Sequence, residues 1–284
     1  MYGLPRMRVN SRHGMLATAA LVLSLSAAPA LSHNPFTSGG EAALAGWLSV
    51  VLLLCLWVVH GVGSWRHPPG RLAGFGFHAT TLLCALALFG PLDGWAKTST
   101  AAHMGQHMLL MVVIAPLWIL CRPLPQLVAG SGRWGAWLWK PMLRLAARPL
   151  YAAYLHAIAI WFWHTPYFYM AAVDNPWWHA VEHVCFLVTA GVFWWAVLRS
   201  SARNIPWALL AVLFTLMHTG FLGAILTFAG SPVYGEARDL QDQQLAGLIM
   251  WVPGAIPYIL AAAWIAHRWI RRLQRRMDAA ERRY

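Results

Sequence analysis

Residues 100–121 read TAAHMGQHMLLMVVIAPLWILC, and this stretch holds no Asp, Glu, Lys or Arg. The hydrocarbon core of a bilayer is about 30 Å thick, and a helix needs about 20 apolar residues to cross it. The stretch meets that length, and its two histidines, His103 and His107, fall near its start. We therefore predict a membrane-spanning helix that carries polar side chains close to one of its ends.

The rest of the chain repeats this apolar pattern. Hydrophobic residues make up 59% and charged residues 11%, and the mean hydropathy is +0.52. A soluble domain carries about 25% charged residues, so the soluble classes are excluded. Six further segments are apolar enough to span, at residues 42–62, 72–90, 149–165, 177–198, 206–229 and 244–267. The prediction is an all-α fold, an integral membrane bundle of seven transmembrane helices within residues 31–267.

The N-terminus carries a separate pattern. Three arginines precede an apolar run at residues 15–25, and small residues follow up to Ala30. This order is typical of a secretory signal peptide that is cleaved after the small residues. It is also compatible with an uncleaved signal anchor, which would form an additional helix. Residues 1–30 are therefore expected to be one or the other.

Basic residues are distributed unevenly along the chain. Lys and Arg number 21 against 9 Asp and Glu, a formal net charge of +12. Sixteen of the 21 lie in alternate connections, at residues 66–71, 122–148 and 199–203, and in the tail from Arg268. Because loops rich in Lys and Arg stay in the cytoplasm, the C-terminus is predicted to be cytoplasmic. The basic cytoplasmic tail, residues 268–284, is then expected to contact anionic membrane lipids and no nucleic acid.

The remaining connections are predicted to face the outside. They lie at residues 91–99, 166–176 and 230–243, and they carry acidic residues, among them Asp93 and Asp242. Basic loops on one side and acidic loops on the other give a single consistent orientation. Two of the predicted spans that begin on the outer side also contain the histidine pairs of the chain.

The two histidine pairs have the same spacing. His103 and His107 are four residues apart in one span, and His179 and His183 are four apart in another, with Glu182 between them. Residues four apart share one face of a helix. At a rise of about 1.5 Å per residue, both pairs fall within roughly 10 Å of the outer surface. If the two helices are neighbours, the imidazoles meet and are candidates to hold a metal ion.

The donor types favour copper. Met104 follows His103, and Met250 lies about two turns into the last span. Imidazole and thioether together suit Cu(I), so both methionines are candidate ligands on an uptake path. Methionine also fills gaps in hydrophobic cores, and that alternative stays open. Glu182 has two open roles, either as a direct ligand or as an acceptor that orients a histidine.

The same residues allow other interpretations. The run HAVEH at residues 179–183 matches the zinc-protease pattern H-x-x-E-H, which needs a further acidic ligand. One histidine from each helix would suit the axial positions of haem. A hydrogen-bonded polar core and a transporter pathway also stay open. A retinal protein is excluded, because Lys97 and Lys140 are both predicted to lie in loops.

Three longer motifs can be read along the chain. The first joins PLD at 91–93 to AHMGQHMLL at 102–110 and APL at 115–117, the second runs from PWWHAVEH at 176–183 to FWW at 193–195, and the third is DQQLAGLIMWVPG at 242–254. Together they resemble the CtaG-like cytochrome c oxidase assembly proteins, over roughly residues 45–268. Each motif alone is moderately specific, and the three in combination are specific.

The resemblance implies a multi-pass protein of the bacterial plasma (inner) membrane that helps to assemble an active haem–copper oxidase. That family is taken to help copper reach the CuB centre, so copper, as Cu(I), is the expected cargo. The expected partners are the catalytic subunit of the oxidase and a periplasmic copper carrier. By position, the residues that match the family are His103, His107, His179, His183, Glu182, Asp242 and Met250.

Holding an ion breaks no bond in a substrate, so the chain is expected not to be an enzyme. Two alternative functions stay open beside copper delivery. One is a haem-binding membrane redox or scaffold protein. The other is a copper transport or resistance protein.

Overall fold

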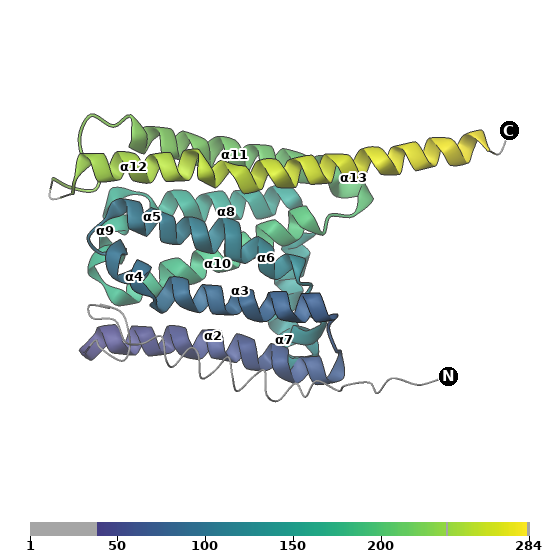
Figure 1. Ribbon diagram of the computed structural model, residues 1–284, viewed down its shortest axis with the longest axis horizontal. Helices are drawn as coiled ribbons and strands as arrows, with labels where there is room; N and C mark the ends of the chain where they lie inside the picture. Colours follow the sequence, from purple (N-terminus) through teal and green to yellow (C-terminus); the bar gives the residue numbers. More distant parts are fainter. Residues whose placement is uncertain (1–38, 237, 283–284) are drawn as a thin grey trace, which may run out of the picture.

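The computed structural model describes residues 39–236 and 238–282, and the regular structure over these residues is entirely helical (Figure 1). The predicted signal peptide or anchor at residues 1–30 lies outside the described residues. Within them, 6 helical segments are long and apolar enough to cross a membrane. The prediction of an all-α membrane bundle is confirmed.

The candidate spans run up and down the bundle. The first three are α2 (Gly40–Arg66), α3 with α4 (Arg71–Phe89 and Pro91–Ala96), and α5 with α6 (Thr100–Met108 and Ala115–Leu120), the last two joined by a π-helical segment at Leu109–Ile114. The next two are α10 (Pro176–Leu198) and α11 (Ile205–Thr227), which follows a 3₁₀ turn at Ala202–Asn204. The last is α12 with α13 (Leu240–Trp251 and Ile256–Glu281), joined by a 3₁₀ turn at Pro253–Ala255. The other helices of the described chain are α7, Leu124–Ala146, α8, Pro149–Trp163, and α9, Pro166–Asp174.

One predicted span is shorter than expected. The segment at residues 149–165 forms α8, whose 15 residues rise about 22 Å, less than the roughly 30 Å of a bilayer core. Pro149 is the first residue of α8, and Pro166 begins α9 three residues after Trp163, the last residue of α8. The helix still lies against α10 and α11 and buries Ala153 and Ile160. It therefore belongs to the bundle as a short member.

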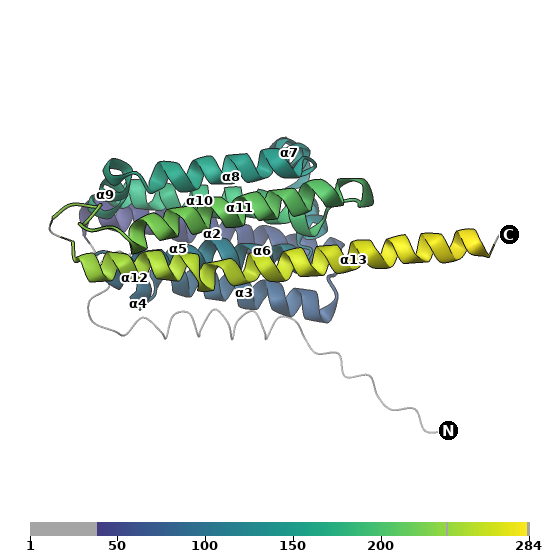
Figure 2. The same cartoon turned by 90° about the horizontal axis from the view of Figure 1, so that it is seen from above.

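The bundle has two different ends, which Figures 1 and 2 show. At one end lie α4, α9 and the first turns of α5, α10 and α12; we call this the histidine end, because His103 and His179 lie in those first turns. At the other end, the arginine end, lie α7 and the turn between α2 and α3. Helix α13 extends beyond the arginine end, so the predicted basic tail continues the last span as helix.

Two polar side chains hold the start of α5. Ser99 caps the helix and accepts the backbone N–H of Ala102 at 3.1 Å. Asp242 of α12 accepts a hydrogen bond from Ser99 Oγ at 2.8 Å and further bonds from the backbone N–H groups of Thr100 and Ala101. A carboxylate at this position also meets the positive end of the helix dipole. These bonds fix α5 against α12 and so set the height of its histidines.

Helix α10 begins in a similar way. Asn175 caps it by accepting the backbone N–H groups of Trp177 at 2.8 Å and Trp178 at 3.3 Å. Pro176 occupies the first helical position, where its missing N–H costs nothing. The histidines of α10 therefore follow the helix start at the same distance as those of α5.

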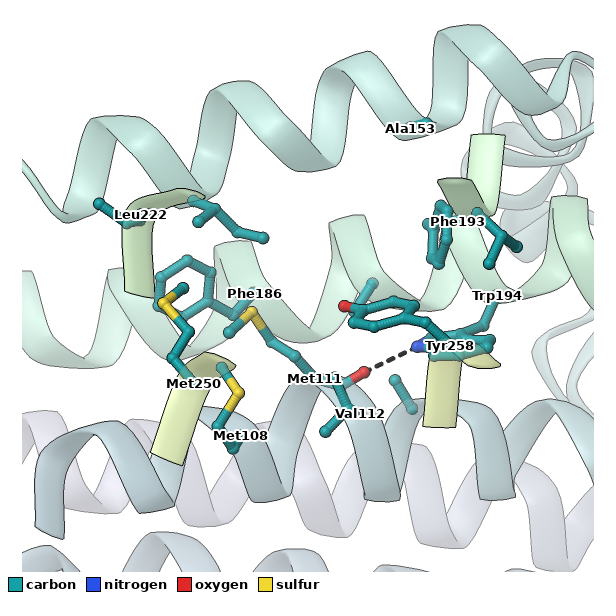
Figure 3. Close-up of a cluster of buried hydrophobic side chains, with 14 of the residues drawn as sticks. Met108, Met111, Val112, Ala153, Phe186, Phe193, Trp194, Leu222, Met250 and Tyr258 are labelled. Carbon is teal, nitrogen blue, oxygen red and sulfur yellow. Dashed lines mark hydrogen bonds between the residues drawn. The ribbon is translucent and has the colours of Figure 1, made fainter. Parts of the chain in front are cut away.

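The backbone of the span that carries His103 and His107 changes from α-helix to π-helix shortly after His107. Residues Leu109–Ile114 are π-helical, and Pro116 follows. Proline lacks the N–H that an α-helix would direct at the carbonyl four residues earlier, and the wider π turn relieves that mismatch. Trp194 of α10 donates its Nε1–H to the backbone oxygen of Met111 at 2.8 Å, as Figure 3 shows. This bond ties the widened turn to α10.

Candidate metal centre

The four histidines predicted as ligands meet between α5 and α10. The ring centroids of His103 and His179 lie 5.3 Å apart, and those of His107 and His183 lie 5.7 Å apart. Within each helix the rings are closer, 4.3 Å on α5 and 4.1 Å on α10. All four residues are buried. The structure thus gathers four imidazoles, which we call the imidazole layer, near the histidine end of the bundle.

Glu182 lies in the middle of the imidazole layer. Its Oε2 atom is 3.3 Å from Nε2 of His103 and 3.4 Å from Nε2 of His107, and its side chain is completely buried. The donor atoms form two groups, and within each group all atoms lie within 4.8 Å of one another. The first combines Glu182 with the α5 pair, and the second combines it with the α10 pair. One carboxylate is therefore shared by both histidine pairs.

The layer contains donor capacity that its own hydrogen bonds do not use. Among the described residues, Nδ1 of His103, Nδ1 of His107 and Oε1 of Glu182 are buried without a hydrogen-bond partner. Buried polar atoms are ordinarily paired, and each one left unpaired costs about 1–3 kcal/mol. An ion or a water molecule bound in the layer would use some of this capacity.

Aromatic and imidazole rings enclose the layer from the side. His164, at the end of α8, has its ring centroid 6.1 Å from that of His107. Tyr169 of α9 lies 5.1 Å from His103 and stacks on Tyr234 at 3.7 Å. Burial raises the pKa of Tyr169 to about 12, so this phenol stays neutral at physiological pH. These neighbours shield the donors from solvent without adding a charge.

Asp93 is a neighbour that the sequence interpretation missed. The sequence pattern places it in an outer connection at residues 91–99, whereas in the structure it lies in α4 and is only 3% exposed. Its Oδ1 atom is 3.9 Å from Nδ1 of His179 and accepts a hydrogen bond from Nε2 of Gln106 at 3.1 Å. The available signal was its place in the PLD motif directly before the histidine-bearing span. A second carboxylate therefore borders the imidazole layer.

The two methionines predicted as ligands lie in a hydrophobic cluster. Met104 follows His103 by one residue and so points about 100° away around the helix axis. Met250 of α12 is buried in the same cluster, with Met108 and Phe186 close by, as Figure 3 shows. The structure therefore gives both thioethers core neighbours, and Met104 lies on a different face of α5 from the imidazoles.

The geometry determines what the layer can hold. Imidazoles with a carboxylate suit borderline and soft cations such as copper and zinc. A haem bound by one histidine from each helix would need a porphyrin between the rings. Here the rings of α5 and α10 meet edge to face at 5.3 and 5.7 Å. A small ion fits this separation better than a porphyrin does.

Comparison with known proteins identifies relatives of the whole bundle. The family model described as cytochrome c oxidase caa3 assembly factor matches residues 42–272. An uncharacterized protein of Mycobacterium bovis and one of Mycobacterium tuberculosis are each 26% identical over a match of 252 residues, and 78% of this chain is covered. The chain spans 37% of the length of these curated relatives. No solved structure matches the chain.

Proposed function

This chain belongs to the cytochrome c oxidase caa3 assembly factor family, and we propose that it holds Cu(I) in the imidazole layer and delivers it to the CuB centre of a haem–copper oxidase. The ligands are His103, His107, His179 and His183, with Glu182 at their centre. Copper is the cargo in this proposal, and the catalytic subunit of the oxidase is the acceptor.

One observation supports the proposal above all others, namely the buried carboxylate of Glu182 between two histidine pairs. A lone charge inside a membrane bundle is costly and needs a partner of opposite sign. Among the described residues, the ion-pair partners of Glu182 are imidazoles. A Cu(I) ion bound by neutral imidazoles supplies one positive charge, which balances the carboxylate.

The proposed transfer is a ligand exchange. CuB centres are rich in histidine and embedded in the membrane, so donor and acceptor use the same ligand type at similar depth. Cu(I) accepts low coordination numbers, so the ion can leave one imidazole before it has gained the next. The close spacing within each pair, 4.3 and 4.1 Å between centroids, keeps successive ligands within reach.

The orientation follows from the charges at the two ends. We place the chain in the bacterial plasma membrane, with the arginine end and the C-terminus in the cytoplasm. The histidine end then faces the periplasm, where a copper carrier would load it. The assembly-factor family suggests a non-catalytic role. In this proposal the HAVEH run at residues 179–183 contributes its histidines and Glu182 to the imidazole layer and not to a zinc-protease site.

The proposal is tested in a strain that lacks the chromosomal gene and carries a plasmid copy. With His107→Ala and His183→Ala together, we expect the purified oxidase to lose copper relative to haem and to lose activity. The variant protein itself should accumulate to near-normal levels. The matched control is His156→Ala with His218→Ala, because this pair removes two histidines of α8 and α11 whose own contacts, to Thr189, Phe193 and Phe214, lie outside the imidazole layer.

Three measurements separate the alternatives. An oxidase with wild-type copper content in the His107→Ala, His183→Ala strain would overturn copper delivery. A large change in total cell copper on deletion would instead indicate transport or resistance. A Soret band in the purified wild-type protein, without bound copper, would indicate haem.

A further inference from the structure

A small chamber lies beside the imidazole layer at the histidine end of the bundle. It has a volume of about 20 Å³ and is lined by residues of α2, α10 and the end of α3, together with Asp93. A cavity needs about 10–15 Å³ to hold one water molecule, so this chamber has room for a single water or a single ion. Pro176 at the start of α10 is part of the wall, so the chamber lies near the helix ends.

The chamber shares side chains with the imidazole layer. His179 and His183 line it, and both also belong to the group of donors around Glu182. Asp93 of α4 faces His179, with its Oδ1 atom 3.9 Å from Nδ1 of His179. His179 therefore lies between two buried carboxylates, Glu182 on the inner side and Asp93 on the chamber side.

Small residues of α2 keep the chamber open. Ala45 and Gly46 are buried and form its wall opposite the histidines, with Ser49 one turn further along. A larger cavity of about 350 Å³ also borders His183, between α2, α3, α7 and α10, but its lining is almost entirely apolar. A bare cation is stabilised by oxygen and nitrogen donors, so the small chamber offers the better path to the helix ends.

We propose that the chamber is a second cation position, formed by Asp93 and His179, through which copper passes between the helix ends and the imidazole layer. The inference rests on the proposed function, because it needs an ion in that layer. An imidazole nitrogen and a carboxylate oxygen 3.9 Å apart suit the same borderline and soft cations, and Cu(I) accepts such a low coordination number. Two cations this close would repel each other, so a single ion alternates between the two positions.

The test measures how fast purified full-length protein in detergent takes Cu(I) from its bicinchoninate complex. With Asp93→Asn we expect uptake to slow by about 10-fold, the lower end of what charge steering contributes to association rates. The equilibrium affinity should stay close to the wild-type value, because Glu182 and the α5 pair are untouched. Asn can still accept the hydrogen bond from Gln106.

A second variant and a matched control complete the experiment. Ala45→Val fills the chamber without removing a donor, and we expect it to slow uptake as well. Asp174→Asn removes an exposed acidic group at the end of α9 that does not line the chamber, and it should leave uptake unchanged. Wild-type uptake rates in Asp93→Asn, or a loss of affinity equal to that of a Glu182 variant, would overturn the second position. Absence of copper binding by the wild-type protein would overturn the proposed function itself.

Discussion

Glu182 governs the chemistry of the imidazole layer, because its buried Oε2 atom contacts His103 and His107 at 3.3 and 3.4 Å. Replacing it with Gln keeps the size of the side chain and removes the charge. We expect Glu182→Gln to weaken Cu(I) affinity by about 10- to 100-fold, as loss of an acidic partner does at other metal sites. Competition with bicinchoninate at equilibrium measures the change.

The same measurement tests both of the roles left open for Glu182. A variant that binds Cu(I) with wild-type affinity would show that the carboxylate neither ligates the ion nor orients its ligands. Asp174→Asn serves as the control for loss of an acidic residue at the same end of the bundle. It should bind copper as the wild type does.

At the level of helices, α5 depends on its neighbour α12. Asp242 accepts hydrogen bonds from Ser99, Thr100 and Ala101 at the start of α5. We expect Asp242→Ala to lower the free energy of unfolding by about 0.5–2 kcal/mol, the usual cost of losing a cap. Affinity for Cu(I) should fall as well, because the α5 histidines lose the contact that sets their height.

Thermal unfolding in detergent and Cu(I) competition measure the two effects of Asp242→Ala together. Asp174→Ala is the matched control, since Asp174 ends α9 and caps no part of α5. Unchanged stability and affinity in Asp242→Ala would contradict the role of this bridge. Reduced stability with unchanged affinity would restrict Asp242 to folding.

Much of this arrangement was predictable from local pattern. The apolar segments gave the spans, because length and composition alone decide whether a helix can cross a bilayer. The spacing of His103 with His107 and of His179 with His183 gave the shared faces. Their common distance from the helix starts gave the common depth, which the caps at Ser99 and Asn175 explain.

Other features depended on contacts between distant residues. Asp93 lies in a segment that looks like an exposed loop, and only the turn of α4 back against α5 buries it. Met104 and Met250 have the chemistry of copper ligands, but their faces were decided by the contact between α5 and α12.

On the scale of the whole molecule, the two ends of the bundle differ in their charged residues. The arginine end carries α7 and the helical extension of α13, and the histidine end carries α4 and α9. In a variant that lacks the native cysteines, we expect a cysteine at Asp174 to react with a membrane-impermeant thiol reagent in spheroplasts. A cysteine at Arg276 should react only after the membrane is permeabilised. The reverse pattern would contradict the proposed orientation.

The central claim is that two buried histidine pairs and one carboxylate jointly bind a copper ion. The most direct measurement is elemental analysis of the purified full-length protein after exposure to Cu(I) and removal of excess metal. For the wild type we predict a copper-to-protein ratio near unity, and for His107→Ala with His183→Ala we predict almost no bound copper. Equal copper in the two proteins, or none in the wild type, would contradict the account.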